Sequence, residues 1–370
     1  MMEPKRIRVA MVTNIPAPYR IPVYERVVRD PRIELCVFFC SGREPDREWD
    51  LQEARYSQVF LKEKFITYRG RFIHCNPDAW SRLSAFKPDV VITTGFNPTF
   101  LVAFAHAWAH GARHVAMTDG TFFTEQGLSG VHRWVRRRVY ARTSAFIGAS
   151  VGSFELYRSY GVDDADLFQS HLCADNAAYS PVPDAQKLHD FVYSARFIPA
   201  KNPLFAMEVA RAVAQKIGRR TRLLMMGSGE LDEALREHAK AMSQEVEVTF
   251  AGFVRQADLP RHYASAHVML FPTQIDTWGV VANEAMAAGV PVLVTPMAGV
   301  ANDLVLDGVN GRVLPLDLPA WTTAAAQLLM DPSCRSSFST QAQDRVQHYS
   351  YDAAAQGICD AVHHACERRP

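Results

Sequence analysis

The segment FPTQIDTWGVVANEAMAAGVPV, residues 271–292, has the pattern of a buried strand that ends in a loop, followed by a helix and the start of another strand. The loop contains Asp276, and Gly279 opens the predicted helix, where a glycine lets the backbone approach a ligand closely. The free amides of Gly279, Val280 and the next residue predict an anion site at the helix N-terminus. One turn further, Glu284 could accept two strong hydrogen bonds from a sugar diol. Alternatively, Asp276 caps the helix and Glu284 is a solvated surface acid.

The same alternation of strand and helix extends outward over nearly the whole chain. Short runs rich in valine and isoleucine alternate with segments of helical period, which is typical of parallel sheets covered on both faces. In the first half we expect strands at residues 7–12, 33–39, 89–94, 113–117, 144–148 and 166–170. In the second half we expect strands at residues 191–195, 222–226, 246–251, 267–271 and 291–295.

A polar, proline-containing break at residues 180–184 divides this pattern in two. At about 150 residues per domain, a chain of 370 residues predicts two domains. We therefore expect two tandem Rossmann-like, doubly wound α/β domains at 1–182 and 183–348, and a C-terminal helix within 349–370 that could pack back on the first domain. In such folds ligands bind at the carboxyl ends of the strands, here in the cleft between the domains.

The composition excludes several classes of protein. A hydrophobic content of 48% with 21% charged residues is that of a globular chain and excludes disorder, collagen and coiled coil. The net charge of +1 does not favour a nucleic-acid partner. Seven cysteines without a CxxC pair, a start without a signal-peptide pattern and the lack of a long charge-free apolar run predict a cytoplasmic protein without a spanning helix.

Two cations follow the first strand of the second half. Arg196 offers a planar fork to phosphate oxygens, and Lys201 offers a point charge. With the helix amides they could stabilise a nucleoside diphosphate as it leaves, so no metal or other cofactor is expected. Taken alone, each cation could also be an ordinary surface charge.

These motifs resemble the retaining nucleotide-sugar glycosyltransferases of family four, which have the GT-B fold. The family signature is two acids separated by seven residues, in a block of the form E-x-F-G-x-x-x-x-E-A-M-A-x-G-x-P-V. Residues 276–292 match nearly all of this block, with Asp for the first Glu and Trp for Phe. The segments 193–202, 223–230, 250–254 and 307–311 resemble further family blocks, in the family's order.

The resemblance implies a role for each matching residue. Glu284 would hold the donor ribose, Asp276 would bind a hydroxyl of the transferred sugar, and Arg196 and Lys201 would hold the diphosphate. Because Asp is shorter than Glu by one methylene, the identity of the donor is open. Further residues expected near the nucleobase, donor sugar or phosphate are Gly227, Phe253, Val254, Gly299 and Val300.

The first half resembles the family in architecture only. Where the family commonly has an active-site histidine after a strand, this chain has Asp119, which we expect to orient an acceptor or donor hydroxyl as a catalytic residue. The first loop lacks the Gly-Gly pair of many relatives. Its residues Asn14, Tyr19 and Arg20 could face the cleft and shape the acceptor site, or the loop could be an ordinary rigid turn.

A basic segment at 132–142 contains five arginines, Trp134 and Tyr140 and has no acidic residue. Such a helix could lie on anionic lipid at the inner face of the membrane. Alternatively, it is a solvated helix face with aromatic side chains in the core.

We therefore expect a retaining enzyme that transfers a hexosyl or related group. It would move the sugar from a nucleoside-diphosphate sugar to a hydroxyl of a glycan or lipid-linked saccharide, in polysaccharide or glycoconjugate biosynthesis. The resemblance further implies that the leaving phosphate itself takes the acceptor proton. Two alternatives stay open, a nucleotide-sugar epimerase of GT-B fold and a non-catalytic nucleotide-sugar binder.

Overall fold

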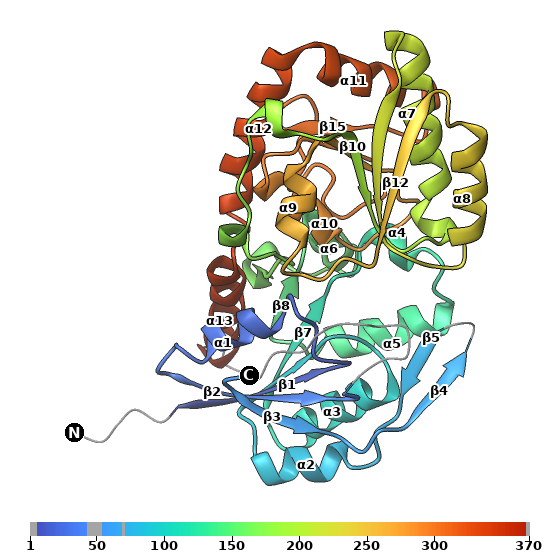
Figure 1. Ribbon diagram of the computed structural model, residues 1–370. Helices are drawn as coiled ribbons and strands as arrows, with labels where there is room; N and C mark the ends of the chain where they lie inside the picture. Colours follow the sequence, from blue (N-terminus) through green and yellow to red (C-terminus); the bar gives the residue numbers. More distant parts are fainter. Residues whose placement is uncertain (1–5, 43–53, 69–70, 368–370) are drawn as a thin grey trace. The chain divides into compact units, whose positions relative to one another are not determined.

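The computed structural model describes residues 6–42, 54–68 and 71–367, and the chain divides into two compact units (Figure 1). The first unit combines Met1–Leu172 with Tyr351–Pro370, and the second is Cys173–Ser350. The second unit begins before the division expected at residue 182 because the segment after Cys173 is bonded to it. The side-chain amide of Asn176 donates to the carbonyl oxygens of Val346 and Tyr349, at 2.9 and 3.3 Å.

A seven-stranded parallel sheet forms the centre of the first unit, in the order β3-β2-β1-β6-β7-β8-β9. Residues Val9, Ala10, Met11 and Val12 of β1, an inner strand, are buried because helices cover both faces of the sheet. The strands are β1 (Ile7–Thr13), β2 (Ile33–Phe39), β3 (Ser57–Phe60), β6 (Val90–Thr93), β7 (Arg113–Thr118), β8 (Ala145–Gly148) and β9 (Leu167–Gln169). A separate antiparallel pair consists of β4 (Phe65–Tyr68) and β5 (Arg71–His74).

The helices of the first unit include the C-terminal helix of the chain. It lies beside α1 (Figure 1) and packs against β8 and β9. A side chain in place of Gly357 would put a Cβ atom 1.7 Å from the carbonyl oxygen of Gln169, so this glycine permits the close approach. The helices are α1 (Ile21–Val27), α2 (Ala79–Phe86), α3 (Pro98–Ala109), α4 (Phe122–Glu125), α5 (Gly130–Tyr140), α6 (Val151–Ser159) and α13 (Tyr351–Glu367).

The second unit repeats this plan with a six-stranded parallel sheet in the order β12-β11-β10-β13-β14-β15. Its strands are β10 (His189–Ser194), β11 (Thr221–Met226), β12 (Val246–Gly252), β13 (Ala266–Phe271), β14 (Val292–Val294) and β15 (Gly311–Val313). Its helices are α7 (Pro203–Ile217), α8 (Asp232–Ala241), α9 (Leu259–Ala264), α10 (Val280–Ala287), α11 (Leu318–Met330) and α12 (Pro332–Gln347). Trp321 of α11 is fully buried, and its ring meets the edge of Phe205 on α7.

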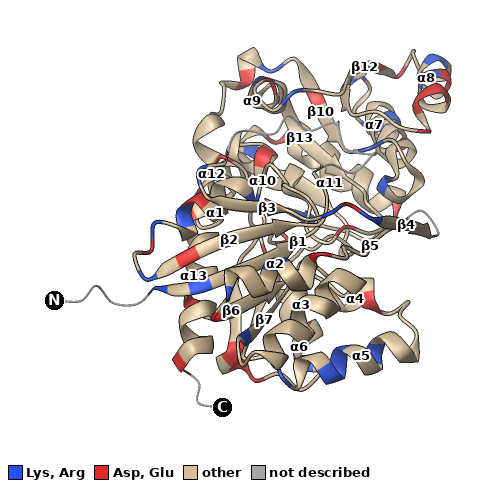
Figure 2. Ribbon diagram, turned by 90° about the horizontal axis from the view of Figure 1, so that it is seen from below, with Lys and Arg blue, Asp and Glu red and all other residues tan. Residues whose placement is uncertain are grey.

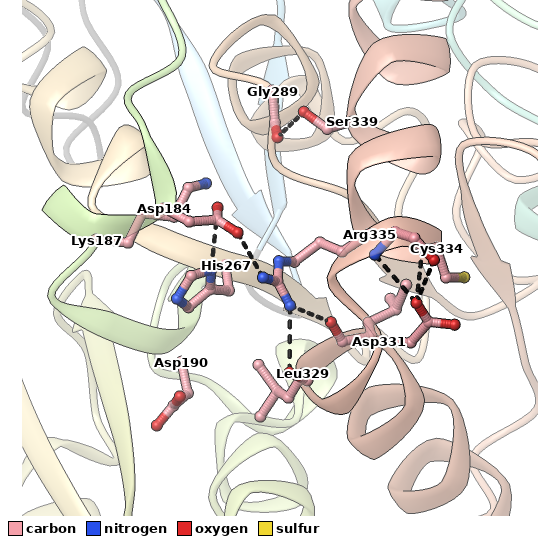
Figure 3. A network of polar contacts seen from close by, with 12 residues as sticks. Asp184, Lys187, Asp190, His267, Gly289, Leu329, Asp331, Cys334, Arg335 and Ser339 are labelled. Carbon is pink, nitrogen blue, oxygen red and sulfur yellow. Dashed lines mark hydrogen bonds and ion pairs between the residues drawn. The ribbon is translucent and has the colours of Figure 1, made fainter.

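A polar network connects the start of the second unit to α12 and β13 (Figure 3). The guanidinium of Arg335 pairs with Asp184 at 2.5 Å and donates to the carbonyl oxygen of Leu328 at 2.6 Å. His267 faces the same carboxylate at 3.6 Å, and burial lowers the pKa of this histidine to about 4. The polar break in the sequence therefore ends in a residue that belongs to the second unit.

The prediction of two doubly wound α/β domains is confirmed, and strand β2 has the predicted bounds. The short strands β3, β4, β5 and β15 were not predicted. In the described part of the chain, no helix is both long enough and apolar enough to span a bilayer.

Candidate functional site

The donor-side residues predicted from the sequence all follow strands of one sheet. Strand β10 lies between β11 and β13, so the strand order reverses beside it. The crevice at such a switch point, outside the carboxyl ends of the strands, is where open α/β sheets bind ligands. The predicted residues follow β10 (Arg196, Lys201), β11 (Gly227), β12 (Phe253, Val254), β13 (Asp276, Gly279, Val280, Glu284) and β14 (Gly299, Val300).

Lys201 and Asp276 form an ion pair across this switch point. The Nζ atom of Lys201 lies 2.6 Å from Oδ2 of Asp276 and donates to the carbonyl oxygen of Ile275 at 3.1 Å. The backbone carbonyl of Lys201 in turn accepts the hydroxyl of Tyr193 at 3.0 Å. The other carboxylate oxygen of Asp276 accepts the backbone amide of Trp278 at 3.3 Å. Asp276 therefore bonds within its own loop and does not cap α10.

Helix α10 begins at Val280, after its N-terminal flanking residue Gly279, and no side chain of the described residues caps it. The φ angle of Gly279 is +107°, and a Cβ atom there would lie 2.4 Å from the ring of Phe271. Only glycine fits this turn. The first-turn amides of Val280 and Val281 are left to an anion or to water.

Glu284 is buried, so the alternative of a solvated surface acid is wrong for this residue. It is 8% exposed, and its Oε2 atom accepts the hydroxyl of Tyr263 at 2.7 Å. Burial raises the pKa of Glu284 to about 7, and hydrogen bonds from Tyr263 and Tyr179 offset only part of this rise. Near neutral pH the side chain therefore exists as both carboxylic acid and carboxylate.

Two of the remaining donor-side residues are exposed beyond the strand ends. Arg196 is exposed two residues after β10, and Phe253 follows β12 with 52% of its surface exposed. Val254 is half-buried beside it. Gly227 has a structural role as well, because a Cβ atom there would lie 1.9 Å from the carbonyl oxygen of Ala195.

The amides of Gly299 and Val300 have main-chain partners. Gly299 donates to the carbonyl oxygen of Asp276 at 3.0 Å, and Val300 donates to that of Trp278 at 3.1 Å. These amides are therefore already used within the protein, and the expectation that Gly299 and Val300 lie near the donor sugar or phosphate stays a prediction. They join the loop after β14 to the loop after β13 and so position Asp276.

In the first unit the predicted residues Asn14, Tyr19, Arg20 and Asp119 line one cavity of about 180 Å³. It lies at the switch point of this sheet, where β1 has β2 on one side and β6 on the other. The Oδ1 atom of Asn14 is buried and has no hydrogen-bond partner within residues 6–42, 54–68 and 71–367. This oxygen is an acceptor available to a ligand hydroxyl.

Arg20 and Asp119 form an ion pair in that cavity. The Nη2 atom of Arg20 lies 2.7 Å from Oδ1 of Asp119, and Nη1 donates to both oxygens of Ser170 at 3.2 Å. The arginine side chain is 7% exposed and the aspartate side chain 36%. The Asp119 carboxylate therefore stays partly accessible from the cavity while it pairs with the buried guanidinium of Arg20.

Three tyrosines that position the site residues could not be recognised from the sequence. Tyr263 and Tyr179 hold Glu284, and Tyr193 holds the turn that contains Lys201. Tyr193 lies in a strand of apolar residues and looks like core in the sequence, and Tyr179 and Tyr263 belong to no motif. Each hydroxyl has a function only because the fold brings a distant partner to it.

No three His, Cys, Asp or Glu side chains gather as they would around a metal ion in the described ranges of the chain. The expectation that the reaction needs no metal or other cofactor stays a prediction.

Two family models match the chain in succession. Residues 180–345 match Glycosyl transferases group 1, and residues 29–168 match Glycosyltransferase Family 4. One similar curated protein is D-inositol 3-phosphate glycosyltransferase of Kineococcus radiotolerans, 27% identical over 244 residues, which are 58% of this chain and 55% of that protein. Another is GDP-mannose-dependent alpha-(1-6)-phosphatidylinositol monomannoside mannosyltransferase of Mycolicibacterium smegmatis, 31% identical over 43% of this chain and 46% of that protein. The chain thus spans about half the length of these relatives.

Solved structures resemble the chain over nearly its whole length. HepE of Anabaena in complex with UDP and glucose has a TM-score of 0.73 at 17% identity, covering 96% of this chain and 99% of that one. Sucrose-phosphate synthase from Thermosynechococcus elongatus has a TM-score of 0.69 at 16% identity, covering 96% and 98%. At such identities the likeness establishes the fold. Because it agrees with the two parallel sheets and with family models that together match most of the chain, the chain belongs to the glycosyltransferases of GT-B fold.

Proposed function

We propose that this chain is a retaining glycosyltransferase that moves a sugar from a nucleoside-diphosphate sugar to a hydroxyl of a glycan or lipid-linked saccharide. One observation supports this most directly. The cations Arg196 and Lys201 follow β10, the open amides of α10 and Glu284 follow β13, and these two strands are neighbours at a switch point. Groups that bind phosphate and groups that bind a diol therefore meet at one edge of the sheet.

Bond cleavage between the sugar and the diphosphate places negative charge on the leaving oxygen. Lys201 and the amides at the start of α10 are fixed donors near that charge, and fixed donors stabilise a developing charge without having to reorient. Arg196 would add a planar fork to the phosphate oxygens. We expect these groups to act without a metal ion.

The ribose of the donor would bind at Glu284. Two tyrosine hydroxyls hold this carboxyl group in one orientation, so a diol meets an acceptor whose geometry is already fixed. An acceptor saccharide or the donor sugar would bind in the cavity of the first unit. There Asn14 presents a buried oxygen without a partner among the described residues, and Asp119 presents its partly accessible carboxylate.

Retention follows from the family resemblance. In that mechanism the acceptor hydroxyl attacks from the face that the diphosphate leaves, and the leaving phosphate oxygen takes the hydroxyl proton. No side-chain nucleophile is needed. Asp276 would orient a sugar hydroxyl during this step once a bound diphosphate draws Lys201 toward itself.

The nucleotide can be identified by thermal unfolding of the full chain with UDP, GDP, ADP and dTDP, in the presence of EDTA. UDP and GDP are tested first, because a related structure contains UDP and a relative is named for GDP-mannose. We expect one nucleotide to raise the melting temperature, since a ligand at a hundred times its Kd contributes about 2.7 kcal/mol. Lys201→Ala and Glu284→Ala should abolish the shift, while Lys216→Ala, a change on the exposed surface of α7, should keep it.

Transfer is then tested with the matching nucleotide-sugar and a panel of saccharide acceptors. Product formation that Glu284→Ala abolishes supports the proposal, and retention is read from the anomeric configuration of the product. A nucleotide shift without transfer to any acceptor would contradict it. Epimerisation of the donor alone would identify an epimerase instead.

A further inference from the structure

Helix α5 of the first unit exposes apolar and basic side chains on one face. Its inner face consists of Val139 and Tyr140, which are buried, so the tyrosine belongs to the core. The opposite face exposes Val131 at 71% and Trp134 at 58%. A tryptophan exposed to this extent leaves most of its ring in water, which is costly unless something covers it.

Most arginines in and directly after this helix have no acidic partner among the described residues. Residues 126–144 contain five arginines and no Asp or Glu. Arg136 pairs with Glu125 of α4 at 2.9 Å, and both side chains are largely buried. Four others, Arg133, Arg137, Arg138 and Arg142, form no ion pair with any described residue. Figure 2 shows the blue positions of α5 on the outer side of this unit.

These arginines lie around exposed tryptophans. The guanidinium carbon of Arg138 lies 5.2 Å from the centre of the Trp134 ring, and that of Arg142 lies 5.0 Å from the centre of the Trp108 ring. Trp108, at the end of α3, is 66% exposed. We call Trp108, Arg133, Trp134, Arg137, Arg138 and Arg142 the α5 surface.

The chemistry of the α5 surface identifies its partner. Indole rings prefer the headgroup level of a bilayer, and arginine side chains bind lipid phosphates while their stems stay in the apolar layer. A short helix that exposes aromatic and basic side chains in this way lies in the plane of the boundary between bilayer and water. Because the net charge of the whole chain is only +1, a local basic patch such as this surface, and not the chain as a whole, must attract an anionic bilayer.

We propose that the α5 surface binds the face of a bilayer that contains anionic phospholipid. Trp108 and Trp134 enter the headgroup layer, and the four unpaired arginines contact the phosphates. The proposal goes beyond the transfer reaction and does not depend on it, since lipid binding is measured without donor or acceptor.

The test is sedimentation of the full chain with vesicles of phosphatidylcholine alone, or with three parts in ten of phosphatidylglycerol. We expect the wild-type chain to sediment with the mixed vesicles only, and less so as salt rises from 50 to 500 mM, because salt screens the contacts. Arg137→Glu with Arg138→Glu should abolish binding, and Trp134→Ser should reduce it at least about tenfold. A matched control, Lys216→Glu with Lys240→Glu on helices of the second unit, should bind like wild type.

Two further measurements separate lipid binding from a loss of folding. Circular dichroism and the melting temperature show that each variant is folded, and tryptophan fluorescence should shift to shorter wavelength with mixed vesicles in the wild type and less in Trp134→Phe. The proposal is overturned if the wild-type chain does not sediment with the mixed vesicles, or if both α5 variants bind these vesicles as well as the control does. Binding to heparin but not to vesicles would likewise overturn it and assign the surface to a soluble polyanion.

Discussion

Lys201 and Asp276 are 75 residues apart in the sequence, yet the Nζ atom of the lysine lies 2.6 Å from a carboxylate oxygen of the aspartate. The pairing of β10 with β13 brings their loops together. The lysine proposed to hold the donor diphosphate therefore already has an anionic partner, and a diphosphate must compete with Asp276 for it.

Asp276→Asn is expected to tighten binding of the free nucleoside diphosphate by about tenfold, because it removes a negative charge beside the phosphates. The same variant should lose sugar transfer, since the amide is a weaker acceptor for a sugar hydroxyl. Calorimetry measures the first effect and a transfer assay the second. Asp258→Asn, which changes an exposed acid paired with Arg261, is the control and should alter neither. Weaker nucleotide binding by Asp276→Asn would contradict the competition.

The raised pKa of Glu284 predicts a pH dependence of stability. Burial raises this pKa from 4.5 to about 7, so between these pH values the folded chain binds more protons than the unfolded chain. Its free energy of unfolding should therefore fall as the pH rises from 4.5 to 7, by at most about 3 kcal/mol from this residue. Glu284→Gln should lack this component. Urea unfolding of both chains at pH 5 and pH 8 measures the difference, and parallel pH profiles would contradict the prediction.

Nucleotide affinity should respond to pH in the opposite direction. A carboxylate accepts hydrogen bonds from a diol more strongly than a carboxylic acid does, so affinity is expected to rise as Glu284 ionises near pH 7. Tyr263→Phe removes a hydrogen bond that favours the carboxylate and should move this midpoint to higher pH. Titration of the nucleotide between pH 5.5 and 8.5 gives both midpoints. Equal midpoints in the two chains would contradict the assignment of the pH effect to Glu284.

The burial of the Arg20–Asp119 pair predicts that an Asp→Asn substitution destabilises the chain more there than in an exposed ion pair. Asp119→Asn leaves a buried guanidinium without its anionic partner and should destabilise the first unit by about 2 kcal/mol. Asp164→Asn breaks an exposed pair with Arg158 and should have no measurable effect. Denaturant midpoints of the full chain compare the two. An Asp119→Asn chain as stable as Asp164→Asn would contradict the prediction and show that the groups of Ser170 and His171 satisfy Arg20 without an anion.

Alanine substitutions at two glycines distinguish the cost of backbone strain from the cost of a steric clash. Gly308 has a φ angle of +72° with open space around its Cα atom, so Gly308→Ala should cost about 1 kcal/mol. Gly279→Ala adds a clash with Phe271 at 2.4 Å and should cost about 3 kcal/mol, with loss of nucleotide binding at the start of α10. Unfolding and nucleotide titration of both variants test this. Equal stability would mean that the Phe271 ring moves aside at little cost.

The sequence by itself determined the two parallel α/β domains and the residues at the strand ends. Strands such as β2 and helices such as α7 have local hydrophobic periods, and a period is readable without the fold. The block at 276–292 likewise places an acid, a glycine and a second acid at fixed distances along one loop and helix. For the same reason, Arg196 and Lys201 could be assigned to the end of β10.

Only the tertiary structure decided what those residues contact. The pairing of Lys201 with Asp276, the burial of Glu284 against Tyr263, and the use of the Gly299 and Val300 amides by neighbouring loops all depend on strands far apart in the chain. The same holds for α5, where the sequence left open which aromatic residue is core. Hydrogen bonds and burial between distant segments form when the sheet assembles, so no local pattern in the chain records them.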